Sequence, residues 1–335
     1  MPKDEFSIRL HEARMMMGLS MDKLVELTNG AITKQSISRY EKGIMHPKRD
    51  AMTALVHALH ISEAYFKGTN LRIDVPMLRT TSDGKLSDEE VQTIEAQLSF
   101  WTEQYLTKEQ KVGMTSRFVN PIKGIQISTM KDAIQAANLL RKKWHCGDGP
   151  IASVLRLLER KGIKIMVAEL PDGVFGISTW ADKRHPLMVL DIRTNKTTVE
   201  RLRFTACHEL AHLLLTFPEE SEFGIEKRCN KFASYFLFPK ETFFSEMGGT
   251  WRDSLTLEEM IDLKEIYGVS VAAQVHEAWD LQMISREHYD WWYDERINKN
   301  RKETGWGEYK FPETIGREKR IESRIENMTE RGKEV

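Results

Sequence analysis

The stretch Arg203-Phe-Thr-Ala-Cys-His208-Glu209-Leu-Ala-His212-Leu-Leu-Leu215 decides how the middle of this 335-residue chain folds. Its surroundings predict a helix that begins at a capping box, Thr197-Thr-Val-Glu200, and ends before Phe217-Pro218. On such a helix His208 and His212 lie one turn apart on the same face. The apolar stripe expected to be buried comprises Val199, Leu202, Ala206, Leu210, Leu213 and Leu214.

Two imidazoles on one helical face can bind a single metal ion, and Glu209 beside the first can reach a water on that ion. This is the H-E-x-x-H arrangement of zinc peptidases, in which the glutamate takes a proton from the water. The alternative is a pair of buried structural histidines. Histidine is scarce, 10 residues in 335, and burying two imidazoles around a glutamate without a partner is costly. We therefore expect a metal site.

A catalytic zinc usually has three protein ligands, so one more is expected. The next predicted helix, roughly 222–238, carries Glu226, Cys229 and Asn230 on one side. Glu226 is the natural choice because it gives a His₂Glu site. The alternatives that the sequence leaves open are Glu219, Glu220, Glu222 and Cys229.

The amino-terminal region, from Ile8 to about Phe66, divides into four or five short amphipathic helices. The third, Thr33–Glu41, should bury Ile37 and Tyr40. Its outer side carries residues that can pair with base edges or hold phosphates: Lys34, Gln35, Ser36, Ser38 and Arg39. The same polar face also fits a solvated surface or a protein contact, since the region is only slightly basic.

Composition places the chain among ordinary globular proteins, with 41% hydrophobic residues, 30% charged residues and a net charge of −1. No apolar run is long enough for a membrane span, and the start resembles no signal peptide, so a cytoplasmic protein without membrane contact is expected. The three cysteines show no paired spacing and are expected to be reduced thiols.

The order of the motifs suggests four regions. Residues 1–70 form the helix-turn-helix domain, and 71–129 form a linker at about 72–86 followed by a connecting helix from Ser87 to about Lys111. Residues 130–295 form the catalytic domain, and 296–335 a charged, partly helical tail. In the catalytic domain two helices, Met130–Trp144 and Ile151–Lys161, precede strand candidates at 163–167, 174–180 and 187–190.

The amino-terminal region resembles the XRE, or Cro/repressor-like, helix-turn-helix. The matching positions are Arg14, Gly18-Leu19-Ser20, Leu24, Ile37-Ser38, Glu41, Gly43, Pro47, Leu55, Ala58-Leu59 and Ile61-Ser62. Met21 departs from the family, which usually carries a phosphate-contacting glutamine there. The resemblance implies binding to double-stranded DNA at an operator or promoter, and it is compatible with a homodimer.

Residues from about 87 to 295 resemble the ImmA/IrrE family of metallopeptidases. The matching pieces are Trp101-x-x-x-Tyr105-Leu, Leu140-Arg141-x-x-Trp144, Pro150-Ile151, Gly162-Ile-Lys-Ile, Arg203-Phe-Thr with His208 to His212, and Glu226-x-x-x-Asn230-x-Phe232-Ala233 ending at Pro239. The resemblance implies Zn²⁺ held by His208, His212 and Glu226, with Glu209 as general base. Cys229 stands where the family commonly has alanine.

The expected fold is multidomain and mainly α. It combines a five-helix DNA-binding domain with an α+β zincin-like peptidase domain that has a small sheet and a helical carboxyl-terminal part. The expected function is a DNA-associated zinc endopeptidase that regulates transcription by cleaving a repressor or similar protein. The alternative is a DNA-binding regulator or antitoxin-like protein whose peptidase fold is a sensor or scaffold. His185 and Tyr235 are candidates for stabilising an oxyanion.

Overall fold

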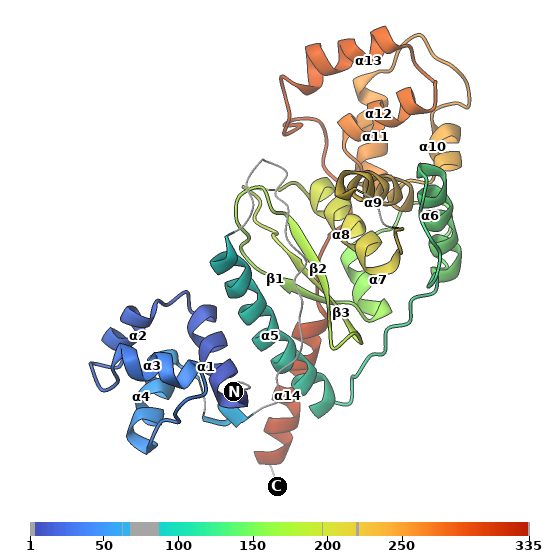
Figure 1. The fold of residues 1–335 in the computed structure, drawn as a ribbon. Helices are drawn as coiled ribbons and strands as arrows, with labels where there is room; N and C mark the ends of the chain where they lie inside the picture. The colour runs from blue at the N-terminus through green and yellow to red at the C-terminus, as the bar shows by residue number, and fades with distance from the viewer. Residues whose placement is uncertain (1–3, 62, 68–86, 196, 219–220, 334–335) are drawn as a thin grey trace.

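The computed structural model describes residues 4–61, 63–67, 87–195, 197–218 and 221–333 (Figure 1). Helices dominate, and one three-stranded sheet lies at the centre of the larger domain. The α-helices are α1 (Glu5–Met16), α2 (Met21–Leu27), α3 (Lys34–Glu41), α4 (Arg49–Leu59), α5 (Asp88–Lys111), α6 (Met130–Trp144), α7 (Val154–Lys161), α8 (Val199–Leu214), α9 (Glu222–Leu237), α10 (Lys240–Glu246), α11 (Leu257–Tyr267), α12 (Val271–Asp280), α13 (Arg286–Trp292) and α14 (Arg317–Lys333). The strands are β1 (Lys164–Val167), β2 (Gly176–Ala181) and β3 (His185–Leu190), and short turns η1 (Glu63–Lys67) and η2 (Tyr293–Ile297) complete the elements.

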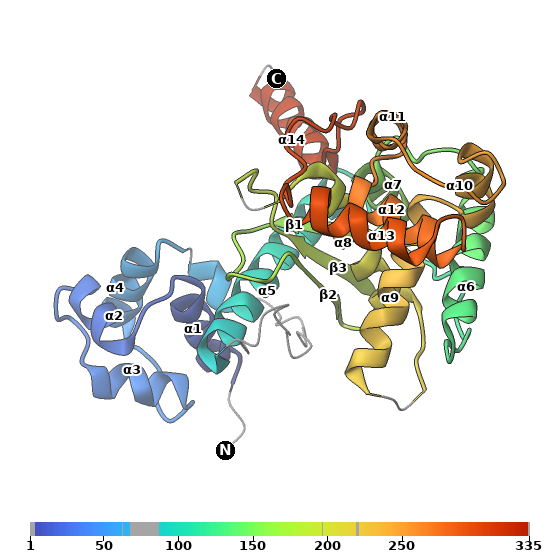
Figure 2. The ribbon, with the colours of Figure 1, turned by 90° about the horizontal axis from the view of Figure 1, so that it is seen from above.

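The first four α-helices and η1 enclose their own core, which includes Leu10, Leu24, Ile37 and Leu55. Helix α2 begins after Ser20, whose side chain accepts a hydrogen bond from the Lys23 amide. Helix α3 begins at Thr33, whose side chain accepts a hydrogen bond from the Ser36 amide. These helices form the amino-terminal helix-turn-helix domain, on one side of the molecule in both views (Figures 1 and 2).

Helix α5 joins the two domains. A capping box between Ser87 and Glu90 starts it, as the sequence predicted. The helix packs against α1, where the guanidinium of Arg9 donates to the carboxylate of Glu103 at 2.8 and 2.9 Å. The linker predicted at 72–86 lies outside the described residues. Because α5 contacts both α1 and the sheet, it holds the amino-terminal domain against the larger one (Figure 1).

The sheet has the order β1-β3-β2, with β1 parallel and β2 antiparallel to β3. Alternation along β3 gives it two apolar faces. Leu187 and Val189 pack in a cluster with Leu98 of α5, whereas Met188 and Leu190 join the core around α8. Strand β2 lies at one edge of this sheet, as the order shows, and it packs beside α8.

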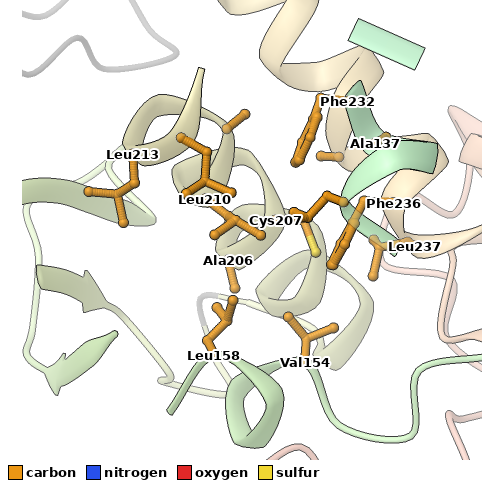
Figure 3. Close-up of a cluster of buried hydrophobic side chains, with 14 of the residues drawn as sticks. Ala137, Val154, Leu158, Ala206, Cys207, Leu210, Leu213, Phe232, Phe236 and Leu237 are labelled. Carbon is orange, nitrogen blue, oxygen red and sulfur yellow. The ribbon is translucent and has the colours of Figure 1, made fainter. Parts of the chain in front are cut away.

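Helix α8 is the centre of the main core (Figure 3). Ala206, Cys207 and Leu210 are fully buried there, and Phe232 and Phe236 of α9 pack on the same side. The predicted start was wrong by one residue, because Thr198 rather than Thr197 caps the helix and accepts from the Arg201 amide. Val199 is 42% exposed, so it does not belong to the buried stripe. A residue in the first turn of a helix lies at the edge of the surface that the helix buries.

Helix α7 begins at Val154 rather than at Ile151. Its cap is Ser153, and the carboxylate of Glu313 accepts hydrogen bonds from the amides of Val154 and Leu155. A residue 158 positions away thus satisfies the first amides of the helix. Local pattern cannot reveal such a cap.

The carboxyl-terminal part has a second core formed by α10 to α13. After it the chain returns to the larger domain. Glu313 forms an ion pair with Arg203 of α8, at 2.5 Å, and both side chains are almost completely buried. Further on, α14 packs on α5, with Ile321 fully buried and Arg317 paired with Glu109. The end of the chain is therefore integrated into the fold, at least as far as Ile321.

Candidate metal centre and DNA-facing helix

Helix α8 places His208 and His212 together as the sequence predicted. Their Nε2 atoms are 3.0 Å apart, and the ring centroids are separated by 4.8 Å. The core around Leu210 and Ala211 fixes the rotation of the helix, so that the two imidazoles face the cleft and neither is fully buried. Two nitrogen donors therefore converge on one point.

Helix α9 supplies a third donor. The Glu226 carboxylate lies 3.1 Å from Nε2 of His208 and 3.2 Å from Nε2 of His212. Among the described residues this is the one group of three histidine, cysteine or acidic side chains whose donor atoms can converge, all within 4.8 Å of one another. The expectation that Glu226 lies with the histidines is met, and the arrangement leaves room for one ion between the donors.

The electrostatics of Glu226 suit a metal ligand. Burial opposes the charged carboxylate, but the adjacent imidazoles of His208 and His212 outweigh this effect and hold the pKa of Glu226 well below its usual value. A charged carboxylate with two imidazole nitrogens is a donor set that zinc accepts in catalytic sites. The residues present therefore fit a zinc ion.

The other candidate ligands do not join this group. Glu219 and Glu220 lie outside the described residues, as does the side chain of Glu222. Cys229 is fully buried, and its sulfur lies 3.7 Å from Nδ1 of His212, the ring nitrogen that points away from the three donors. Burial also raises the pKa of the Cys229 thiol, which disfavours the thiolate that would bind metal.

Asn230 orients the first histidine. It follows Glu226 by one helical turn, and its Oδ1 lies 2.8 Å from Nδ1 of His208. An amide oxygen only accepts, so Nδ1 carries the proton and donates it, which leaves the Nε2 lone pair directed at the other donors. The sequence indicated that Asn230 shares a face with Glu226, but it did not indicate this role.

Glu209 is held by a residue that sequence reasoning missed. Ser178 of β2 donates from Oγ to Oε2 of Glu209 at 2.6 Å. The strand approaches the helix closely because Gly176 lacks a side chain: a Cβ there would lie 2.6 Å from Cγ2 of Thr205 and 3.1 Å from Cγ of Glu209. The available signal was a polar pair, Ser178-Thr179, inside an otherwise apolar strand.

The metal centre opens into a cleft of about 1290 Å³. One wall is the β2 edge, the floor is α8, and the opposite side is formed by α9 and α12. Neither His185 nor Tyr235, the two oxyanion candidates, lines it. His185 starts β3, at a distance from the cleft, and the Tyr235 hydroxyl is committed to the Glu277 carboxylate. Neither residue is therefore placed to stabilise an oxyanion in the cleft. The sequence alone did not indicate which side chains of these elements face the cleft.

Helix α3 presents the predicted polar face. Lys34, Gln35 and Arg39 are exposed, Ser36 and Ser38 are half-buried, and Ile37 and Tyr40 are buried as expected. Lys34 forms an exposed ion pair with Asp22 of α2 at 2.6 Å. Helix α1 packs on α5, and Lys34, Gln35 and Arg39 of α3 stay exposed to a partner.

A buried ion pair holds the helix-turn-helix together. The guanidinium of Arg14 donates to the Glu41 carboxylate at 2.6 and 2.9 Å. Although burial opposes the charge, hydrogen bonds from Arg14 and His11 lower the pKa of Glu41 to about 2. The pair fixes the end of α3 against α1 and thereby orients the polar face.

Comparison with known families agrees with both halves of the chain. Residues 158–278 match the model of the IrrE N-terminal-like domain, which defines peptidase family M78. Residues 10–66 match a helix-turn-helix family model. No curated protein matches the chain at a significant level. Among the described residues, no helix is both long and apolar enough to cross a membrane.

The chain therefore joins a region similar to helix-turn-helix domains, residues 10–66, to a region similar to the peptidase domain of family M78, residues 158–278. In particular, it carries an IrrE N-terminal-like peptidase domain behind an XRE-type helix-turn-helix, which confirms the recognition made from the motifs.

Proposed function

We propose that the protein is a DNA-associated, zinc-dependent endopeptidase that regulates transcription by cleaving a repressor or similar regulatory protein. The observation that carries this proposal is the convergence of His208, His212 and Glu226 beside Glu209 in a large cleft. A scaffold without catalysis would have no need to keep three donors and a tethered carboxylate together.

In this proposal His208, His212 and Glu226 hold zinc. Bound zinc supplies Lewis acidity for the scissile carbonyl and lowers the pKa of water. Glu209 takes a proton from the attacking water at Oε1, the oxygen that Ser178 leaves available, and passes it to the leaving amine. Ser178 holds the carboxylate in one orientation, and Asn230 keeps Nε2 of His208 free of a proton.

The β2 strand offers the substrate a place to bind. Within the described part of the chain it pairs with β3 alone, so the backbone groups along its other edge can form hydrogen bonds with an extended peptide. Ser178 belongs to this strand and contacts Glu209, so a peptide paired with β2 would pass directly beside the general base. An unfolded or extended segment of a protein substrate fits this geometry.

Helix α3 would bind DNA and so keep the peptidase at a promoter. Lys34, Gln35, Ser36, Ser38 and Arg39 are proposed to contact an operator or promoter, with Gln35 and Arg39 suited to base edges. Because α5 packs against both domains, DNA binding would place the cleft near proteins on the same promoter. Proteolysis would then be confined to few substrates.

Two measurements on three proteins test the proposal: bound zinc and regulated transcription, for the wild type, Glu209→Gln and His208→Ala. We expect stoichiometric zinc in the wild type and Glu209→Gln, reduced zinc in His208→Ala, and loss of regulation in both variants. Unchanged regulation by zinc-loaded Glu209→Gln would instead support the non-proteolytic regulator. Absence of zinc from the wild type after zinc is supplied would overturn the ligand assignment.

A further inference from the structure

Arg201 lies in the cleft on the same helix as the metal centre. It precedes His208 by seven residues, or two helical turns, so the two positions are separated by about 10 Å along the helix axis. Its side chain is exposed and lines the cleft, and its guanidinium carbon lies 4.4 Å from the centre of the Phe175 ring. Phe175 directly precedes β2, the edge strand.

The charge of Arg201 has no carboxylate partner among the described residues. Two lysines of α9 also line the cleft. Lys231 forms ion pairs with Asp280 at 2.7 Å and with Glu277 at 3.5 Å, both on α12. Lys227 lies over Phe223 and adjoins Glu226 in sequence. For Arg201, desolvation by the surrounding protein lowers the pKa of the guanidinium, and no acidic side chain of the described chain offsets that effect.

A guanidinium that lies over an aromatic ring keeps its N–H groups available to bind a carboxylate through two parallel hydrogen bonds. An extended peptide advances about 3.3 Å per residue, so the distance of about 10 Å corresponds to roughly three residues. We propose that Arg201 binds an acidic side chain of the substrate, located about three residues from the scissile bond. This proposal rests on the proposed peptidase function and names a substrate class for it.

The test uses the full-length, zinc-loaded protein and a library of peptides amidated at their carboxyl ends, so that no terminal carboxylate competes with a side chain. Cleavage by the wild type should select aspartate or glutamate at one position about three residues from the cut. Arg201→Glu should lower kcat/KM for the acidic peptides on the order of tenfold relative to alanine-substituted peptides, and should favour lysine at that position.

Arg160→Glu is the matched control, because Arg160 is exposed, lies outside the cleft and undergoes the same change of charge. It should keep the wild-type preference. Cleavage by the wild type without any acidic preference would overturn the role of Arg201 and leave the peptidase function standing. An equal loss for acidic, neutral and basic peptides in Arg201→Glu would also overturn it, because that pattern indicates a structural role.

Binding separates failure of this inference from failure of the peptidase function. Fluorescence anisotropy with a labelled acidic peptide of the same library should show weaker binding to Arg201→Glu/Glu209→Gln than to Glu209→Gln. If the wild type cleaves nothing but this difference in binding is observed, the peptidase function fails and the carboxylate site stands. If the wild type cleaves no peptide and the two variants bind the acidic peptide equally, both the peptidase function and the carboxylate site are refuted.

Discussion

Asn230 shows how one amide determines what a histidine can do. Its oxygen accepts from Nδ1 of His208, which makes Nε2 the donor to a metal. Loss of such an outer partner typically costs about 10- to 100-fold in metal affinity. Asn230→Ala should therefore weaken zinc binding in a chelator competition, whereas Asn230→Asp, which still accepts, should restore it. Equal zinc affinity for all three proteins would contradict this role.

Glu41 makes the stability of the helix-turn-helix domain depend on pH. Its pKa is about 2 in the folded chain against an ordinary 4.5, so the folded state favours the charged form. The resulting stability is present above about pH 4.5 and is lost as the pH falls toward 2, and it amounts to roughly 3 kcal/mol at most.

Glu41→Gln should be less stable than the wild type at pH 7, and the difference should shrink as the pH falls. The difference in stability is measured on the full chain between pH 7 and pH 3 by thermal unfolding. Hydrogen exchange then assigns the difference to the amino-terminal domain. A difference that stays constant across that range would show that the charge of Glu41 is not the cause.

At the scale of elements, the contact between β2 and α8 positions Glu209, the proposed general base. Gly176→Ala would bring a Cβ against Cγ2 of Thr205, so the strand must move away from the helix and the bond from Ser178 to Glu209 must lengthen. We expect kcat for peptide cleavage to fall about tenfold or more, since such displacements are costly in active sites.

Thr205→Ser removes the methyl group that the new Cβ would meet. The double variant Gly176→Ala/Thr205→Ser should therefore recover much of the lost kcat, while Thr205→Ser alone should change little. Steady-state kinetics of the four proteins form a double-mutant cycle. Additive effects of the two substitutions would refute a steric origin.

Local signals predicted some elements well and others poorly. The start of α5 at Ser87 was predicted correctly because its own capping box marks it, and α6 has the predicted bounds, Met130–Trp144. The start of α7 was predicted three residues too early, at Ile151, although the local cap Ser153 marks it, and Glu313 adds a second cap from a distant segment. The meeting of His208 and His212 was predicted because they lie one helical turn apart. Ser178 was missed because its partner lies on another element.

At the scale of the whole molecule, the carboxyl-terminal segment contacts and stabilises α8, the helix that carries His208 and His212. Arg203 of α8 donates to Glu313, to the carbonyls of Ile151 and Tyr267, and stacks on Tyr309. Glu313→Ala would leave a buried guanidinium without its carboxylate, which typically costs about 3–5 kcal/mol.

The peptidase domain of Glu313→Ala should thus unfold at lower urea concentration, and limited proteolysis should cut near α7 first, where the carboxylate caps the helix. A matched change at exposed Glu308, Glu308→Ala, should have little effect. Equal urea midpoints for the two variants would show that the buried pair is not stabilising.

The arrangement of the domains explains why a DNA-facing helix and a protein cleft occur in one chain. Helix α5 contacts α1 on one side and the sheet on the other, and α14 packs on it (Figure 2). A substrate that reaches the cleft therefore does so at a defined position relative to α3. The sequence indicated both modules, but only the packing of α5 relates them in space.

The most direct test of zinc-dependent peptide cleavage with Glu209 as general base uses a peptide library. Its cleavage by the zinc-loaded wild type is compared with cleavage by Glu209→Gln loaded to the same zinc content. We predict that the wild type cleaves and that the variant is slower by about 10²- to 10⁴-fold, the contribution of a general base. Equal cleavage by the two proteins, or none by the zinc-loaded wild type, would contradict the account.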